Sequence, residues 1–437
     1  MASGPGIRIS GFGSIDCGIG IFNISLSYQV NHTFAGGALR LRDALRQPLE
    51  PALGNASEGK QFFFADIAYG ASAIFCVIIQ EAKSMASELP AIGKISPEAF
   101  RDHVYPYLGA HNANVLVGPQ SGVDIAITRV APGTVMATTT DPVFVVPAYG
   151  WQRAAWFAAH ILASDAATSG LAPTLMTVDL NLPLSMSTED FGTLWRHFAN
   201  SCDAMGISII SGHTARYQGC DYPMVGGATV MSIGPEDSYV TAGMARPGDI
   251  LLCTKGAAIE ATGLFAATFP AYIQKNLGLD IYQAADALFD QMSVVEDARI
   301  ASRAGVREYG VTAMHDATEC GVVGGVYEIA EASGVGVVLL DDQILIRPEV
   351  RAVTELVSID PLISISEGTL LLTVAPHRTD AVIQALAAHG IDTQIIGEMT
   401  DASQGMWREC KGIRKPLVHP RVDPFWEAFG QTMAKEV

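Results

Sequence analysis

Four neighbouring segments in the first half of the chain decide the fold: VLVGPQSGVDIAITRV at 115–130, VMATTTDPVFVV at 135–146, WQRAAWFAAHILA at 151–163 and SDAATSGLAPTLMTVDLNLP at 164–183. The third segment predicts a helix, and the others predict strands with loops between them. Asp124, Asp141 and Asp165 each stand where an apolar strand or helix is expected to give way to a loop. Residues 135–139 are predicted to be a strand that ends at Thr140-Asp141-Pro142, because a residue before proline favours extended geometry and projects its side chain off the strand end.

These three aspartates are predicted to converge on Mg²⁺ ions bound to a nucleoside triphosphate. Mg²⁺ prefers hard oxygen ligands in octahedral geometry, so proteins usually hold it with a few carboxylates and let phosphates complete the shell. The alternative is that each aspartate lies in a turn and bonds its own backbone. Three such residues in one segment weaken this alternative, but it stays open.

The composition indicates a core-rich, acidic enzyme-like protein. The 437 residues are long enough for two or three domains, 49% of them are hydrophobic, and only 16% are charged. The formal net charge of −18 disfavours nucleic acid and membrane-surface partners, because such a surface repels phosphate groups. An anionic nucleotide would therefore need local neutralisation, which a divalent cation supplies.

The cysteines and the N-terminal region bear on location. Seven cysteines with no CxxC pair fit neither a zinc ribbon nor a disulfide scaffold and suggest a reducing cytoplasm. No secretory signal pattern opens the chain. The apolar run at 62–79 contains Asp66 and has no flanking basic anchors, so a buried helix or a subunit contact is favoured over a membrane span. Residues 1–88 are treated as an N-terminal extension with no assigned chemistry.

Two domains are predicted after this extension, over 89–240 and 241–437. In the first, helices are expected after Ser96-Pro97 and after an N-capping Ser187, and the strand ISIISGHT is expected to deliver Gly212, His213 and Thr214 into a loop. The turn-rich link TAGMARPGD at 241–249 marks the boundary. Alternating strands and helices follow it, which favours an α+β or α/β domain.

Two further constellations are candidates for phosphate or substrate contacts. Lys255 and Gly256 follow a predicted strand and precede a helix, where an ammonium and backbone N–H groups suit a phosphate; an exposed strand-end lysine is an equal alternative. His315-Asp316-Ala317-Thr318-Glu319-Cys320 precedes a helix that begins at Gly321, so a ligand phosphate or a simple helix cap both fit. Cys320 has no clear base partner, which disfavours a nucleophilic role. His213 is a candidate base or phosphate ligand, although a structural role is common at such positions.

Taken together, these segments resemble the aminoimidazole ribonucleotide (AIR) synthetase superfamily from about residue 89 to the C-terminus. The superfamily includes that purine enzyme, thiamine-monophosphate kinase, selenophosphate synthetase and HypE-type hydrogenase maturation factors, and the C-terminal half looks closest to the HypE type. The resemblance rests on motifs in family order: VGPQSGVDIAI, TTTDPV, ASDAATSGLAP, SGHT, ARPGDILLCTKG, HDATECGV with EIAEASGVGV, and IRPEV, SIDPL and SEGTLLLTV.

The resemblance implies an α+β, two-domain AIR synthase-like fold whose N-terminal sheet pairs across a homodimer and whose C-terminal domain is a ferredoxin-like α/β domain. It implies ATP in a cleft, Mg²⁺ held by Asp124, Asp141 and Asp165, and a further site role for Asp316. Two departures stand out. Val123 precedes Asp124 where relatives often carry a second acidic residue, and the sequence ends QTMAKEV without the Pro-Arg-Ile-Cys tail of HypE proteins. Carbamoyl dehydration on a terminal cysteine is therefore not expected.

The function expected from the sequence is an ATP- and Mg²⁺-dependent enzyme that transfers the γ-phosphoryl group to an amide, carbonyl or phosphate oxygen of a small molecule. Asp124, Asp141 and Asp165 would hold metal, His213 and Asp316 would be catalytic, and the phosphate-contact candidates are Lys255, Gly256, Gly212, Thr214 and Thr140. The alternative is a non-catalytic, HypE-like maturation or assembly partner that binds nucleotide.

Overall fold

The computed structural model describes residues 95 and 97–436. The extension predicted over 1–88 and the apolar run at 62–79 lie outside the described residues. Among the helices that the structure describes, none is both long enough and apolar enough to cross a membrane. The first described helix, α3 (Pro97–His103), begins at the proline of the predicted Ser96-Pro97 start.

The N-terminal half of the described chain forms a six-stranded sheet with the order β1-β2-β3-β6-β4-β5. Its strands are β1 (Val115–Val117), β2 (Ala126–Ala131), β3 (Thr134–Phe144), β4 (Pro173–Leu182), β5 (Ser208–Arg216) and β6 (Met224–Pro235). Neighbours run antiparallel except β4 and β5, which are parallel because helix α5 (Thr188–Met205) connects them as a crossover. Ser187 caps α5 as predicted, its hydroxyl accepting a hydrogen bond from the Asp190 amide at 3.0 Å.

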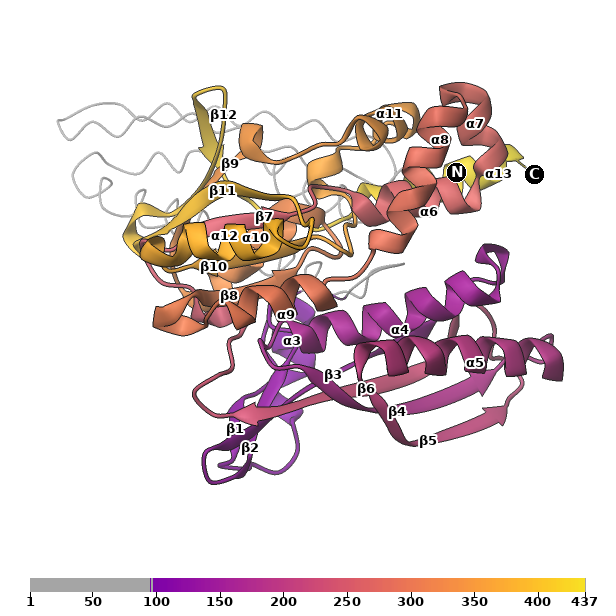
Figure 1. Cartoon of the computed structure of the whole chain (residues 1–437), viewed down its shortest axis with the longest axis horizontal. Helices are drawn as coiled ribbons and strands as arrows, with labels where there is room; N and C mark the ends of the chain where they lie inside the picture. Colours follow the sequence, from indigo (N-terminus) through magenta and orange to yellow (C-terminus); the bar gives the residue numbers. More distant parts are fainter. Residues whose placement is uncertain (1–94, 96, 437) are drawn as a thin grey trace, which may run out of the picture. The chain divides into compact units, whose positions relative to one another are not determined.

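Helices α5 and α4 (Trp151–Ala167) cover one face of this sheet (Figure 1). Strand alternation explains which residues face them: Val178, Leu180 and Leu182 of β4 are buried against the helices, whereas the intervening Asp179 is exposed. The α4–α5 face therefore forms an apolar core. On the opposite face, Ile233 of β6 remains 46% exposed.

Two predicted strand ends are wrong, because both strands continue past them. Asp141 lies inside β3, where it pairs with Ala228 of β6, and Gly212, His213 and Thr214 lie inside β5, paired with β4. Proline is tolerated within sheets at edges and bulges. Pairing of β3 with β2 stops at Thr138, and the register with β6 shifts after Pro142. Pairing with β6 keeps Asp141 extended, and pairing with β4 does the same for Gly212, His213 and Thr214. Neither pairing is visible in the local sequence.

The C-terminal half forms a seven-stranded sheet with the order β13-β12-β9-β11-β7-β10-β8. Its strands are β7 (Ile250–Thr254), β8 (Val311–Asp316), β9 (Gly336–Leu340), β10 (Leu370–Val374), β11 (Thr393–Thr400), β12 (Met406–Cys410) and β13 (Ile413–Pro416). The five strands from β9 to β8 pair antiparallel, and the β12–β13 hairpin is added through a parallel pairing of β12 with β9. This sheet is larger than a single ferredoxin-like βαββαβ unit.

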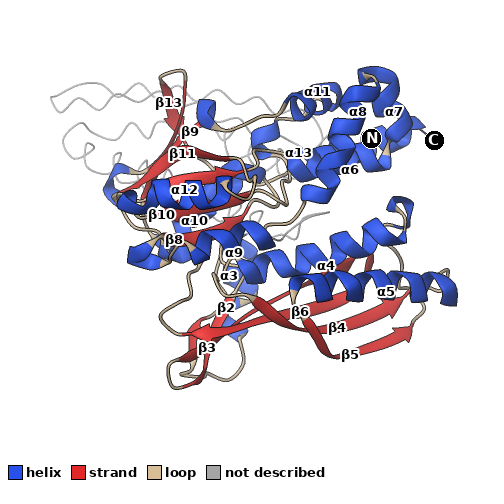
Figure 2. Ribbon diagram, viewed as in Figure 1, coloured by secondary structure: helices blue, strands red, loops and turns tan. Residues whose placement is uncertain are grey.

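Both faces of the second sheet are covered by helices (Figure 2). Helix α10 (Gly321–Ser333) packs on the face that carries Leu251 and Leu371, while α9 (Val295–Arg303) and α12 (Thr379–Ala387) pack on the face that carries Leu252 and Leu372. A further apolar core joins five other helices, α6 (Ile259–Thr268), α7 (Pro270–Leu277), α8 (Leu279–Ala287), α11 (Pro348–Val357) and α13 (Pro424–Glu436).

Candidate functional site

The three aspartates predicted to bind metal come from three different elements and lie near one another. Asp124 is in the loop before β2, Asp141 is within β3, and Asp165 is in the last turn of α4. The buried Thr139 links two of them, because its Oγ1 lies 3.2 Å from Asp141 Oδ2 and 3.1 Å from Asp165 Oδ2. A hydroxyl has only one proton, so it donates to one carboxylate at a time.

The other carboxylates contribute to the electrostatic surroundings of Asp165. Burial, together with the nearby charges of Asp316, Asp124 and Asp141, raises the pKa of Asp165 well above its ordinary value. Like charges disfavour one another's ionised form, and a bound cation relieves that repulsion. The donor set of carboxylates from a loop, a strand and a helix therefore fits a hard divalent cation.

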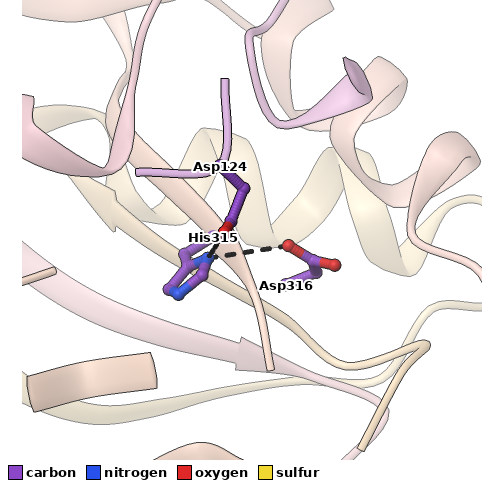
Figure 3. Close-up of side chains that lie close together, drawn as sticks. All are labelled: Asp124, His315 and Asp316. Atoms are coloured by element: carbon purple, nitrogen blue, oxygen red, sulfur yellow. Dashed lines mark ion pairs between the residues drawn. The ribbon is translucent and has the colours of Figure 1, made fainter. Parts of the chain in front are cut away.

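Strand β8 contributes Asp316 and a histidine that the sequence analysis did not assign as a ligand. His315 Nδ1 lies 3.4 Å from Asp124 Oδ2 and 3.6 Å from Asp316 Oδ1, and both carboxylates are directed toward the imidazole (Figure 3). One ligand atom from each of the three residues lies within 4.8 Å of the others. His315 and Asp316 are buried, whereas the side chain of Asp124 is 32% exposed.

The loop that carries Asp124 is held against helix α10 by a glycine. Gly122 has a φ of +72°, and a Cβ at this position would lie 2.9 Å from Glu328 Cβ and 3.0 Å from Glu328 O. Only glycine accepts both the left-handed backbone and this close approach without strain. Glu328 in turn contacts His315, with Oε2 2.8 Å from His315 Nε2. The same helix residue therefore positions the Asp124 loop and the imidazole.

Two glutamates extend the acidic region deeper into the protein. Glu367 is buried, and its Oε1 accepts a hydrogen bond from Ser164 Oγ at 2.7 Å, next to Asp165 on α4. Burial raises the pKa of Glu367 well above its ordinary value, and the charges of Asp316 and Glu260 add to the shift. Burial also raises the pKa of Glu260 to about 8. Sequence reasoning missed both, although Glu367 lies in the SEG segment that was noted as a motif.

Lys255 lies at the end of β7 but is engaged elsewhere. Its Nζ donates to Asp297 Oδ2 at 2.9 Å and to Ser293 O at 2.7 Å, and the two charged side chains are only 10% and 4% exposed. The backbone at Lys255 has a φ of +59°, an uncommon conformation for a residue with a side chain. In this structure the ammonium is therefore the counter-ion of Asp297.

Gly256 and Thr140 have separate surroundings. Gly256 has a φ of +97°, and a Cβ there would meet Leu345 O at 2.5 Å, so the turn after β7 requires glycine. Thr140 is on the face of β3 opposite to Thr139 and Asp141, because side chains alternate along a strand. Its hydroxyl lies 2.9 Å from Thr229 Oγ1. Neither residue is brought into the carboxylate cluster.

The SGHT residues lie on the edge strand, away from the aspartates. Gly212 is in one row with Val178, Ala228 and Asp141 across β5, β4, β6 and β3. Three strand spacings place it about 14 Å from Asp141. His213 is exposed, and its Nε2 lies 3.1 Å from Tyr217 OH. Gly212, His213 and Thr214 are therefore separate from the carboxylates.

Family models match most of the described chain. The N-terminal domain of the AIR synthase related protein family matches residues 122–233, and its C-terminal domain matches residues 246–407. A carbamoyl dehydratase HypE of Escherichia coli is 28% identical over 312 residues, which cover 70% of this chain and 88% of the relative. A putative hydrogenase expression/formation protein of Methanocaldococcus jannaschii is 22% identical over 338 residues, covering 76% and 96%.

Solved structures share the fold. Escherichia coli HypE superposes with a TM-score of 0.56 at 21% identity, covering 79% of this chain and 98% of HypE. A ThiL protein complexed with AMPPCP and TMP gives a TM-score of 0.54 at 18% identity, covering 68% and 89%. These matches confirm the predicted α+β, two-domain AIR synthase-like fold. The chain therefore belongs to the AIR synthase related protein family, with HypE-type proteins among its relatives.

Proposed function

We propose that this chain is an ATP- and Mg²⁺-dependent enzyme that transfers the γ-phosphoryl group of ATP to an amide, carbonyl or phosphate oxygen of a small molecule. The supporting observation is that Thr139 Oγ1 contacts both Asp141 and Asp165, while burial and the nearby charges of Asp316, Asp124 and Asp141 raise the pKa of Asp165. An acidic protein needs such a site to seat a triphosphate. One relative is a carbamoyl dehydratase, and one structural neighbour is described in complex with ATP.

Phosphoryl transfer depends mainly on positioning and on charge neutralisation. When bound, Mg²⁺ would neutralise phosphate oxygens and polarise the transferred group. Asp124, Asp141 and Asp165 would hold it, and Thr139 orients two of these carboxylates through its hydroxyl. Asp316, whose charge contributes to the raised pKa of Asp165, would interact with an acceptor beside them. Phosphate or substrate contacts remain proposed for Lys255, Gly256, Thr140, Gly212, His213 and Thr214. Because Gly212, His213 and Thr214 lie on β5, apart from the carboxylates, their contact with a ligand would be distant from the metal.

Charge-neutral variants of two carboxylates test this function. Asp141→Asn and Asp165→Asn should each abolish Mg·ATP-dependent phosphate release and weaken Mg·ATP binding measured by calorimetry, because each removes one anionic oxygen ligand. Asp179→Asn is the matched control, since Asp179 is exposed on β4 and its carboxylate contacts Asn181. Undiminished turnover in both cluster variants would refute the assignment.

A second candidate is a non-catalytic, HypE-like maturation or assembly partner that binds nucleotide. It is favoured by the relatives named for hydrogenase expression or formation and by a structural neighbour solved as a HypE–HypF complex. Calorimetry with Mg·ATP, followed by phosphate release with candidate acceptors, separates the two functions. Nucleotide binding without turnover for any acceptor supports the partner function.

A homodimer formed through the open face of the six-stranded sheet is also proposed. Helices α4 and α5 cover the other face, whereas Ile233 and Met224 of β6 are 46% and 51% exposed. Apolar residues on an uncovered sheet face favour pairing with a second sheet. Sedimentation of the wild type and of Ile233→Glu tests this, and an unchanged dimer in the variant, or a wild-type monomer, counts against the proposed face.

A further inference from the structure

The C-terminal segment that follows β13, residues 417–423, crosses from the second sheet to the helices around α6. Leu417 at its start is buried in the core that contains α10, and Phe425 just after its end is buried in the core that contains α6. Val422 is 76% exposed, whereas its neighbour Asp423 is only 4% exposed. A carboxylate buried beside an exposed apolar residue needs polar partners, because burying an unpaired charge is costly.

Asp423 bonds one backbone N–H group of its own helix and one of a distant loop. Its Oδ1 accepts a hydrogen bond from Phe425 N at 2.8 Å, and its Oδ2 accepts one from Cys320 N at 2.7 Å. Because α13 begins at Pro424, the first bond makes Asp423 the N-cap of that helix, a common role for aspartate. The second bond has no part in capping α13, since Cys320 lies 103 positions earlier, in the loop between β8 and α10.

A third backbone N–H group, that of Ile365, also interacts with this carboxylate. Burial raises the pKa of Asp423 to about 6, whereas the N–H groups of the three segments lower it. At pH 8 the side chain is therefore ionised and acts only as an acceptor. Hydrogen bonds to an ionised carboxylate are stronger than those between neutral groups, so one side chain holds three segments of backbone together.

The two loops that Asp423 joins to α13 carry acidic residues of the candidate site. Asp316 lies four positions before Cys320, and Glu367 lies two positions after Ile365. Burial raises the pKa of Glu367, and the charge of Asp316 adds to this rise, so the two acidic side chains influence each other. The bonds of Asp423 therefore bear on how both of these carboxylates are held.

The loop at Cys320 has a backbone conformation that depends on its neighbours. Cys320 has a φ of +65°, which is uncommon for a residue with a side chain. The next residue, Gly321, approaches the other loop so closely that a Cβ at position 321 would lie 2.5 Å from Ser364 O. Helix α13 adds a contact to the preceding residue, because Trp426 Nε1 donates to Glu319 Oε1 at 3.2 Å. Contacts from the C-terminal part of the chain therefore hold this loop in place.

We propose that Asp423 is a positioning residue of the candidate site, which holds the loop after Asp316 and the loop before Glu367 in the arrangement that phosphoryl transfer requires. This inference rests on the proposed function and extends it to the C-terminal segment. Phosphoryl transfer depends on accurate positioning, and a displacement of about 1 Å can slow an enzyme about 100-fold. A residue that acts only through these loops should affect turnover more than nucleotide binding.

Two substitutions separate positioning from helix capping. Asp423→Asn and Asp423→Ser both keep a side-chain oxygen that can cap α13, because Asn, Asp and Ser are similarly good N-caps. Asn presents an amide N–H₂ group in place of the second oxygen, and Ser has only one oxygen. Both variants therefore keep the local bond to Phe425 N and lose the bond to Cys320 N.

Asp249→Asn is the matched control. Asp249 is also 4% exposed, and its Oδ2 accepts hydrogen bonds from Arg246 N at 2.8 Å and from Thr312 Oγ1 at 2.6 Å. It precedes β7, and the pairing of β7 and β8 with β10 places it at the end of the sheet opposite to Asp316. Its replacement tests the loss of a buried carboxylate without a change in the two loops.

The experiment uses the full chain at pH 8, below the unfolding temperature of every variant. Phosphate release is measured against the concentration of Mg·ATP, which gives kcat and KM separately. Amide hydrogen exchange is measured on peptides that cover residues 317–322 and 363–367. Exchange reports whether the loops are held, and it does not depend on turnover.

We expect both Asp423 variants to lower kcat about 10–100-fold with little change in KM for Mg·ATP. The Cys320 amide should exchange at least about 10-fold faster, because it loses a hydrogen bond to a charged group. Asp249→Asn should leave kcat and exchange in both loops unchanged.

Wild-type kcat, or wild-type exchange at the Cys320 amide, in the folded Asp423 variants overturns the proposal. An equal fall of kcat in Asp249→Asn also overturns it, because the effect would then follow from any buried carboxylate. A wild type that binds Mg·ATP but releases no phosphate refutes the proposed function instead, and exchange alone then decides whether Asp423 holds the two loops.

Discussion

Replacement of Lys255 by methionine should destabilise the protein strongly. The Lys255 ammonium and the Asp297 carboxylate are 10% and 4% exposed and 2.9 Å apart, and the ammonium also bonds Ser293 O. Asp297 Oδ1 is buried and has no hydrogen-bond partner. Methionine keeps much of the side-chain volume, and it leaves the buried carboxylate without its counter-ion.

Removing one partner of a buried ion pair costs about 3–5 kcal/mol, because the remaining charge stays desolvated. A change of 1 kcal/mol shifts Tm by about 2–4 °C for domains of this size, so the expected fall is about 6–20 °C. The double variant Lys255→Met with Asp297→Asn should lose less than the sum of the single variants, because the two residues share one interaction. The exposed Lys275 on α7 offers a control, and Lys275→Met should leave Tm nearly unchanged.

The assay is thermal and denaturant-induced unfolding of the four variants, with Mg·ATP binding measured in parallel. A Lys255→Met protein that keeps the wild-type Tm within about 2 °C but no longer binds Mg·ATP would refute the reasoning. In that case Lys255 leaves Asp297 to contact phosphate, as the sequence alone had predicted.

Three further changes test the site and its buried groups. Gly122→Ala should lower the free energy of unfolding, measured with denaturant, by about 1–3 kcal/mol more than Gly133→Ala does. Both glycines have a positive φ, but only the Cβ at position 122 would contact Glu328. Equal losses in the two variants would contradict this close approach. Burial raises the pKa of Glu260 from its ordinary 4.5 to about 8, so the stability that its protonated carboxyl contributes is lost as the pH rises from 4.5 to 8. Glu260→Gln should flatten the dependence of the unfolding free energy on pH in this range. An unaltered dependence would count against this role of Glu260. Burial lowers the pKa of His160 from 6.5 to about 4, so its contribution is lost as the pH falls through that range; His160→Gln should reduce the loss, and an unchanged acid transition would exclude this origin.

The sequence predicted most helices of the C-terminal half, and it named Asp124, Asp141 and Asp165 as metal ligands, a role that stays a prediction. Aspartates near element ends are visible in a single sequence, as are helix caps such as Ser187. The backbone around two of these aspartates was not predictable. Asp141 is inside β3 and Asp165 is still within α4, because pairing with β6 and packing against the sheet extend both elements.

The rest of the site depends on contacts between distant segments. His315 was seen only as part of a polar run before a helix, since nothing local indicates that Glu328 orients it or that the Asp124 loop reaches it. Lys255 has the sequence context of a phosphate ligand, but its partner Asp297 lies 42 positions later on α9. Thr140 faces away from Thr139 and Asp141 because side chains alternate along a strand, and this alternation could be applied only once β3 was known to continue through Asp141.

The loop that carries Gly122 and Asp124 packs on helix α10 of the C-terminal half. Asp124 lies in the loop before β2 of the first sheet, whereas Asp316 ends β8 of the second, so a cation held by both carboxylates would connect the two sheets. Its apparent affinity then scales with the fraction of molecules in which the layers are closed upon each other. Solvents or substitutions that part the layers will release the ion even when every coordinating atom is intact.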